Sequence, residues 1–344
     1  AASCRMALAG LLHDLGKFAE RARIDVPGDR LEGHEHLYCP FRKDGGFHTH
    51  KHAAWSALAF DRIEGHLLAA RGEDVFPFAG WKSADADDSL INAAARHHTP
   101  DTFLQWIVAT ADRVASGFER ESFAGYNLAA DETTQKKNHY TARLMPLLEQ
   151  VRLDGAPATV PTHRYRLSAL SPAALFPVPA KGYEQDDREV AKAEYMALWQ
   201  QFEAGLAAIP ASHRASPALW LDHFESLWLA FTHAIPSATA FGAKPDVSLY
   251  DHSKAVAALA VALWRYHHDR GDDPATARDR LADQRSDWDE EKFLLVQGDF
   301  FGIQDFIFAS GGATQKRAAK LLRGRSFQVS LLTECAALKV LEAL

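Results

Sequence analysis

The sequence predicts a mainly α-helical protein that ends in the beginning of an α/β unit. Helical spacing of apolar residues recurs along most of the 344 residues, and the chain is 47% hydrophobic, which is enough to bury more than one sizeable core. The first convincing strand is "KFLLVQGD" at 292–299. We therefore expect three regions: 1–125, 126–290 and a truncated one at 291–344.

The first 120 residues are expected to be all-helical. Between the first two helices, residues 24–48 are predicted to form a loop, because Pro40 and the pair Gly45-Gly46 interrupt any regular pattern. The expected helices cover residues 3–23, 50–71, 87–98 and 101–117.

Helical patterns return after a polar, irregular stretch and a connector that contains several prolines. They predict helices at 184–207, 217–234 and 251–270. After the expected strand, a short helix at 302–309 and a long amphipathic helix from about 314 to the end complete a β-α-α order. That order begins an α/β unit, but a single strand does not make a sheet.

Composition excludes several classes of protein. No apolar run reaches the roughly 18 to 20 residues of a membrane span, and the N-terminus lacks the pattern of a secretory signal, so no membrane partner and a cytoplasmic location are expected. The net charge of -7 argues against general attraction to nucleic acid. The three cysteines lie far apart in the sequence, so they indicate neither a disulfide framework nor a CxxC zinc site. Histidine is unusually frequent, with 17 residues in the whole chain, and it is most concentrated before position 100.

Four groups of potential metal ligands occur in order on the predicted helices. Taken singly, each is better explained as a helix cap or a surface pair, and Asp112 could pair with Arg113 or Arg96. Taken together they predict a site for one or two divalent transition ions, Mn, Fe, Co or Ni, with Zn possible. Two such ions about 3.5 to 4 Å apart would activate water against a phosphodiester. The predicted ligands are His13, Asp14, His52, His97, His98 and Asp112.

Other residues near these groups have two interpretations each. Lys17, or an arginine near the site such as Arg96, could stabilise negative charge that develops during the reaction; Lys17 could equally lie on a solvated face. The stretch "HEHLYCPFRKDGGFHTH" could bind zinc, or it could cover the active site and contact the substrate. Its candidate ligands are His34, His36, Cys39, His48 and His50.

The ordered ligand set resembles the HD superfamily of metal-dependent phosphohydrolases. "HKHAAWS" looks like its second histidine motif, "ARHHTPD" like its paired histidines and "ATADRVASG" like its closing aspartate. One departure is that many HD enzymes carry a further histidine upstream of the HD pair, and nothing before His13 can serve. Either His50 substitutes for it, or the site holds one tight and one loose metal.

Longer stretches resemble the large subunit of type III-A CRISPR-Cas effector complexes, the Csm large subunit. They are "RYRLSALSPAALFP", "PSATAFGAKPDVSLYDHSKAVAALAVALW" and "GDFFGIQDFIFASGGATQKRAAKLLRGRSF". The resemblance implies an HD-type helical bundle at 1–125, a linker and helical connector at 126–290, and the start of a ferredoxin-like first palm domain at 291–344. It also implies a nuclease for single-stranded DNA that acts in antiviral defence with guide RNA and other subunits.

The family's Gly-Gly-Asp-Asp hairpin, which makes cyclic oligoadenylates from ATP, and its four-cysteine zinc module are missing here. We therefore expect no cyclase activity from this chain, and read "RGDDP" at 270–274 as an interhelical loop.

Three further features lie in the C-terminal half of the chain. Asp299 is expected to cap a turn, and "SLYDHSK" to be structural, with Asp251 as a helix N-cap and His252 without companion ligands. A basic run is suited to nucleic-acid or nucleotide phosphate, or is a solvated face; its members are Lys316, Arg317, Lys320, Arg323 and Arg325.

The favoured hypothesis is a nuclease in which hydroxide on the metal attacks single-stranded DNA. Two alternatives remain: a stand-alone HD phosphohydrolase acting on a nucleotide, and a non-catalytic scaffold that docks guide RNA and small subunits.

Overall fold

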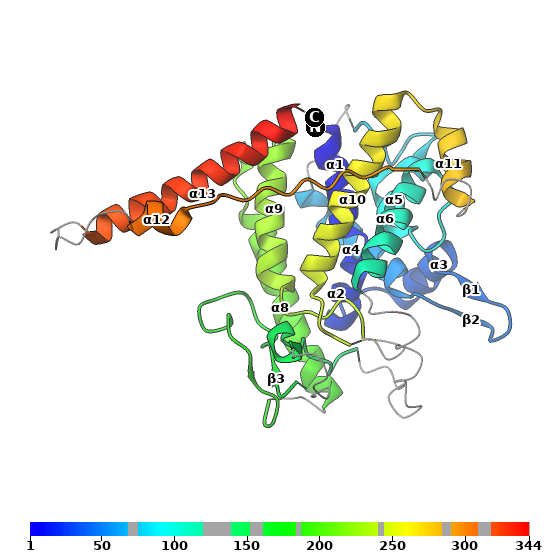
Figure 1. Ribbon diagram of the computed structural model, residues 1–344. Helices are drawn as coiled ribbons and strands as arrows, with labels where there is room; N and C mark the ends of the chain where they lie inside the picture. The colour runs from blue at the N-terminus through cyan, green and yellow to red at the C-terminus, as the bar shows by residue number, and fades with distance from the viewer. Residues whose placement is uncertain are drawn as a thin grey trace. The chain divides into compact units, whose positions relative to one another are not determined.

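The computed structural model describes residues 1–67, 75–119, 139–151, 161–183, 187–239, 244–283, 290–308 and 318–343. They divide into two compact units, Ala1–Lys292 and Phe293–Leu344. The described part is mainly helical, as predicted (Figure 1). It contains no helix with the length and apolar character needed to cross a membrane.

The first unit is built from helices with a few short strands. Its helices are α1 (Ala2–Leu12), α2 (Leu15–Ala22), α3 (Gly28–Tyr38), α4 (His52–Ile63), α5 (Leu90–Ala95), α6 (Phe103–Glu119), α8 (Arg188–Ala208), α9 (Pro217–Thr232), α10 (Leu249–Arg270) and α11 (Pro274–Ala282). Short 3-10 turns cover Glu64–His66, Ala86–Asp88, Leu147–Gln150 and Ala211–His213. Two antiparallel pairs of two-residue strands are β1 (Phe41–Arg42) with β2 (Phe47–His48), and β3 (His163–Arg164) with β4 (Val178–Pro179).

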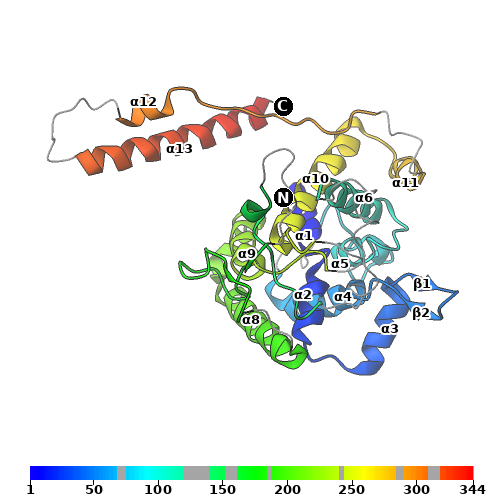
Figure 2. The ribbon, with the colours of Figure 1, turned by 60° about the horizontal axis from the view of Figure 1, so that its bottom comes forward.

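Helix α1 lies in the middle of this unit and packs against α5, α6, α9 and α10 (Figures 1 and 2). Its closest neighbour is α10, because a Cβ added at Gly10 would lie 2.5 Å from the Cα of Ala257. Helices α2, α8 and α9 share an aromatic core, in which the Phe18 ring meets Trp199 edge to face at 5.0 Å. The helices expected at 184–270 therefore pack directly on the N-terminal ones.

Three expectations for the N-terminal region are corrected. The helix expected at 3–23 is interrupted at His13-Asp14, where Asp14 (φ -104°, ψ 16°) leaves helical geometry and becomes the N-cap of α2. The expected loop at 24–48 contains α3 and the β1–β2 hairpin. Its two adjacent glycines, Gly45 and Gly46, form the hairpin turn rather than a break.

The second unit contains α12 (Ile303–Phe308) and α13 (Ala318–Ala343), close to the predicted helices. The strand expected at 292–299 is wrong: this segment has no regular structure and is largely exposed. A strand needs a neighbour for its backbone hydrogen bonds, and no described segment pairs with this one.

The turn between α10 and α11 has the structural role predicted for "RGDDP". Gly271 ends α10 with a left-handed φ of 70°, and the Asp273 side chain accepts from the backbone N–H of Thr276 to begin α11. At the start of α10 the N-cap is Ser248, so the expected cap at Asp251 is wrong; Asp251 instead accepts a hydrogen bond from the Ser248 hydroxyl at 2.7 Å.

Candidate metal centre

The interruption between α1 and α2 places His13 and Asp14 at one junction, and Ser56 on α4 holds it. The Ser56 hydroxyl donates to the backbone oxygen of His13 and accepts from the N–H of Gly16, both at 2.9 Å. Backbone groups that the helix ends leave without partners are thereby satisfied. A Cβ at Gly16 would lie 1.8 Å from the backbone oxygen of His52, so only glycine permits this crossing of α2 and α4.

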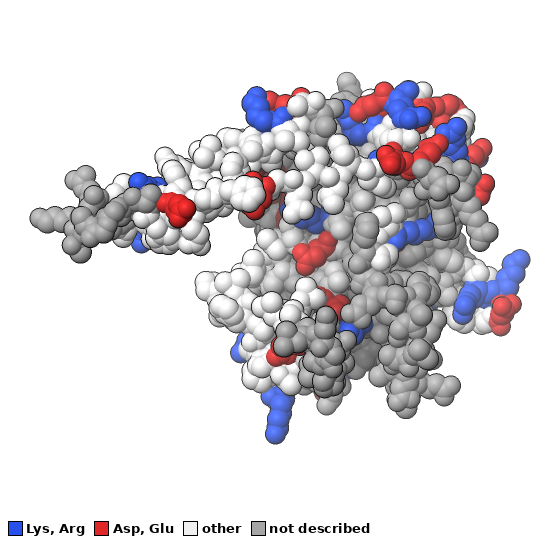
Figure 3. Space-filling view, viewed as in Figure 1, with Lys and Arg blue, Asp and Glu red and all other residues white. Residues whose placement is uncertain are grey.

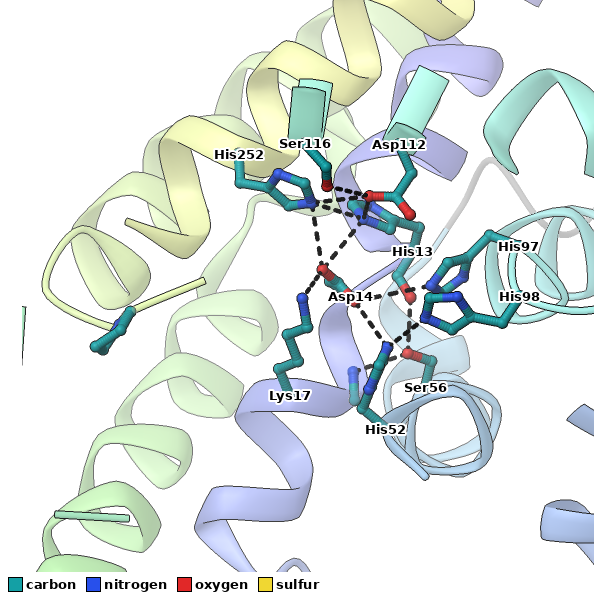
Figure 4. Close-up of polar contacts among 12 residues, drawn as sticks. His13, Asp14, Lys17, His52, Ser56, His97, His98, Asp112, Ser116 and His252 are labelled. Carbon is teal, nitrogen blue, oxygen red and sulfur yellow. Dashed lines mark hydrogen bonds and ion pairs between the residues drawn. The ribbon is translucent and has the colours of Figure 1, made fainter. Parts of the chain in front are cut away.

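The structure brings the six predicted ligands together around Asp14 (Figure 4). Asp14 Oδ2 lies 3.2 Å from His13 Nε2, and Asp14 Oδ1 lies 3.3 Å from His52 Nε2 and 3.9 Å from His97 Nε2. His98 contacts the cluster through His52, because the Nε2 atoms of the two histidines are 2.8 Å apart. His52 is the first residue of α4, and His97 and His98 lie in the turn that follows α5.

Asp112, in the middle of α6, completes the predicted set. Its Oδ1 lies 3.8 Å from His13 Nε2 and 3.2 Å from the Nε2 of His252 on α10. Its near neighbours are thus two histidines rather than Arg113 or Arg96.

His252 is a member of the cluster that the sequence analysis missed. Its Nε2 atom lies 3.2 Å from His13 Nε2 and 3.4 Å from Asp14 Oδ2, and its side chain is 3% exposed. The expectation that His252 lacks companion ligands is therefore wrong, because those ligands come from the other end of the first unit. The available signal was a second Asp-His pair beside small residues, Ala255 and Ala257, that allow a close helix crossing.

Two of the histidines are oriented for ligation by their own helices. His13 Nδ1 donates to the backbone oxygen of Gly10 and His97 Nδ1 donates to that of Ala94, both at 2.7 Å. In the neutral imidazole each Nε2 then carries a lone pair directed into the cluster. Such bonds from the remote nitrogen to a carbonyl are typical of metal-ligating histidine.

Burial keeps three of the histidines neutral. Desolvation lowers the pKa of His97 to about 4 and holds the pKa values of His52 and His98 well below the usual range. Neutral imidazole is the form that binds a cation, so these side chains are ready to ligate at pH 7.

The two carboxylates are ionised in spite of burial. Desolvation opposes the charged form of Asp14, but Lys17 and His13 together hold its pKa well below the ordinary value. Lys17 Nζ lies 2.5 Å from Asp14 Oδ2. The pKa of Asp112 is also lowered, because its hydrogen bond with His252 and the charge of His13 outweigh desolvation.

These side chains fit a divalent transition ion. Three overlapping trios place their ligand atoms within 4.8 Å of one another; they are His52-His97-His98, His13-Asp14-His252 and His13-His97-Asp112. Asp14 Oδ1 and His97 Nε2 are buried and make no hydrogen bond with the described residues. A cation between mixed nitrogen and oxygen donors would satisfy both atoms.

Several predicted residues lie apart from this cluster. The Arg96 guanidinium lies over the Tyr38 ring at 5.7 Å and makes no recorded contact with the cluster in the described part of the chain. His50 lies at the rim, with its ring centroid 4.0 Å from that of His98. Cys39 belongs to none of the possible ligand trios among the described residues, and burial raises the pKa of its thiol to about 11, so a zinc site in the loop is not supported.

The second unit holds the remaining predictions. Lys320, Arg323 and Arg325 lie on α13, whereas Lys316 and Arg317 lie outside the described residues. Arg325 donates to the backbone oxygen of Phe306 and lies over its ring. Asp299 Oδ1 accepts from the backbone N–H of Phe300 at 2.8 Å, the capping role expected for it.

The comparison with known proteins finds a family model and relatives that all carry the name Csm1. The family model described as Csm1 subunit domain B matches residues 292–344. A protein of Methanocaldococcus jannaschii named "CRISPR system single-strand-specific deoxyribonuclease Cas10/Csm1 (subtype III-A)" is 26% identical over 350 residues, covering 95% of this chain and 37% of that protein. The protein of the same name from Thermococcus onnurineus is 28% identical, covering 98% of this chain and 35% of that protein.

Among solved structures, the crystal structure of Csm1 from Thermococcus onnurineus matches with a TM-score of 0.44 and 17% identity, covering 77% of this chain and 29% of that one. The chain spans little more than a third of the length of these curated relatives.

Proposed function

Because this chain belongs to the Cas10/Csm1 family of type III-A CRISPR systems, we propose that its metal centre cleaves phosphodiester bonds of single-stranded DNA. Relatives that align with nearly the whole chain are named single-strand-specific deoxyribonucleases. The observation that carries the proposal is the convergence of five histidines and two aspartates at one point of the first unit.

The metal ligands we propose are the six predicted residues together with His252. In this assignment the first unit contains an HD-type helical bundle in which α10 supplies the histidine that is missing upstream of His13. Asp14 lies between the trios, with Oδ1 facing His52 and Oδ2 facing His13 and His252, so both carboxylate oxygens would be available as ligands to bound divalent ions. Bound divalent ions such as Mn, Co, Ni or Fe would lower the pKa of water and polarise the phosphodiester.

The protein's own groups prepare the site for that chemistry. The hydrogen bonds to Gly10 and Ala94 fix the ring orientation of His13 and His97, and Lys17 holds Asp14 ionised. Lys17 is 21% exposed, so its ammonium is also available to a phosphate oxygen at the open side of the cluster. The Arg96 guanidinium lies over the Tyr38 ring instead of beside the cluster, and we assign Arg96 no catalytic role.

The wider assignment follows the family. We propose that the chain acts in antiviral defence within an effector complex containing guide RNA and other subunits, with the second unit as the start of the first palm domain. A solved structure of the family is described as a Csm1-Csm4 subcomplex of the type III-A CRISPR-Csm interference complex. The basic residues Lys320, Arg323 and Arg325 remain candidates for phosphate contact there.

A cleavage assay on the effector complex tests the proposal. Labelled single-stranded and double-stranded DNA are incubated with added Mn, Co or Ni, using the wild type and Asp14→Ala. We expect cleavage of single strands that requires metal and is lost in the variant. A scaffold without catalytic function would bind no stoichiometric metal, and a nucleotide phosphohydrolase would hydrolyse small nucleotides while leaving oligonucleotides intact.

A further inference from the structure

We infer that the β1–β2 hairpin, residues 41–48, is a surface that binds single-stranded DNA and guides it to the metal centre. This inference rests on the proposed function and deepens it by naming residues that hold the substrate. The hairpin stands beside α3 and α4 in Figures 1 and 2. None of its residues takes part in the metal cluster.

One face of the hairpin carries a row of rings. Phe41 lies opposite His48 in the strand pairing, and their ring centroids are 5.0 Å apart. His48 meets His36 of α3 edge to face at 4.7 Å, with Nε2 and Nδ1 3.0 Å apart. The Phe41 side of the row remains open, since this residue is 53% exposed. An exposed aromatic ring held in place by neighbours is a stacking surface for an unpaired base.

The opposite face carries a second exposed ring. Phe47 lies opposite Arg42 and is 49% exposed. Its ring covers Gly45, where an added Cβ would lie 2.2 Å from Cε1. Gly46 adopts a left-handed φ of 65° and its N–H bonds to the Arg42 oxygen at 2.9 Å, so the turn fixes the place of the ring.

The tip of the hairpin is basic. Arg42 and Lys43 are exposed and make no side-chain ion pair or hydrogen bond with other described residues. Asp44 is the only acidic residue between Phe41 and His48. Figure 3 shows these charged groups at the projecting end of the hairpin. Uncompensated cations beside exposed rings match the alternation of phosphate and base in a single strand.

The base of the hairpin is joined to the metal centre. The Thr49 N–H bonds to the Pro40 oxygen at 2.9 Å, and His48 Nδ1 donates to the Cys39 oxygen at 3.1 Å. The next residue, His50, places its ring 4.0 Å from that of His98. His52 follows Phe47 by five positions in the sequence, so their Cα atoms are at most about 18 Å apart. A strand held on the hairpin is therefore within a few nucleotides of the ligands.

The test uses the effector complex with Phe41→Ala/Phe47→Ala and, separately, Arg42→Ala/Lys43→Ala. Phe176→Ala, which removes an even more exposed phenylalanine on another segment, is the control, at 75% exposure. Affinity for fluorescent oligo-dT is measured without metal, and hydrolysis of the small diester bis(p-nitrophenyl) phosphate is measured with Mn²⁺. Thermal melting checks that each variant is folded.

We expect the double phenylalanine variant to lose roughly tenfold or more in oligo-dT affinity and single-strand cleavage, with the small diester hydrolysed as in the wild type. The arginine-lysine variant should flatten the dependence of log affinity on log salt by roughly 1 to 1.5, corresponding to about two phosphates. Unchanged affinity in both folded variants would overturn the inference. If the wild type hydrolyses neither substrate, the proposed function fails, while the binding measurement still decides the role of the hairpin.

Discussion

The imidazoles of His13 and His252 face each other with their Nε2 atoms 3.2 Å apart, although 239 positions separate them in the chain. Both rings also lie within 3.4 Å of Asp14 Oδ2, and both approach Asp112 Oδ1. Two imidazole nitrogens that face each other at this distance need a shared proton or a cation between them. Through this contact α10 contributes a side chain to the candidate metal centre.

The first prediction is that His252→Ala weakens metal binding by roughly tenfold or more, because it removes one donor of a buried trio. Isothermal titration with Mn²⁺ or Co²⁺ measures the change. The matched control is Asp251→Asn, since the neighbouring carboxylate bonds to Ser248 and not to the cluster. Equal metal affinity in His252→Ala and the control would exclude His252 from the centre.

The second prediction concerns the crossing of α1 and α10. Gly10→Ala places a methyl group 2.5 Å from the Cα of Ala257, so it should lower the free energy of unfolding by roughly 1 to 3 kcal/mol and weaken metal binding by separating His13 from His252. Denaturant melts and metal titration report the two effects. Gly117→Ala, a helical glycine with open space around it, should not destabilise the protein.

The third prediction concerns the charge that holds Asp14 ionised. Lys17→Met removes the nearest cation, so the pKa of Asp14 should rise and the acid limb of the activity profile should move to higher pH. The measurement is cleavage rate against pH at saturating metal. An acid limb at the wild-type position would show that Lys17 does not control this carboxylate.

The fourth prediction concerns acid stability of the metal-free protein. His97 has a pKa of about 4 when folded and about 6.5 when unfolded, so the unfolded chain binds the proton first as pH falls. The stability is complete above pH 6.5, and on the order of 3 kcal/mol should be lost as pH falls to about 4. Denaturant melts of the chelator-treated wild type and of His97→Gln measure it, and the variant should lose less over this range.

Much of the metal centre could be predicted because its ligand types recur in a fixed order on predicted helices. His252 was missed because its partners come from α1 and α6, and no local spacing marks such a contact. The interruption at His13-Asp14 was hidden because apolar residues continue on both sides of it. The segment 292–299 has strand-forming residues, but pairing depends on a neighbour that sequence spacing does not provide.

The most direct measurement of the central claim is Mn²⁺-dependent cleavage of labelled single-stranded DNA by the effector complex, compared between the wild type and Asp14→Asn. The account predicts cleavage that saturates with Mn²⁺ in the wild type and is absent in the variant, which keeps the size of the side chain but loses its charge. Equal cleavage by both proteins would show that Asp14 and the six side chains around it are not the nuclease centre.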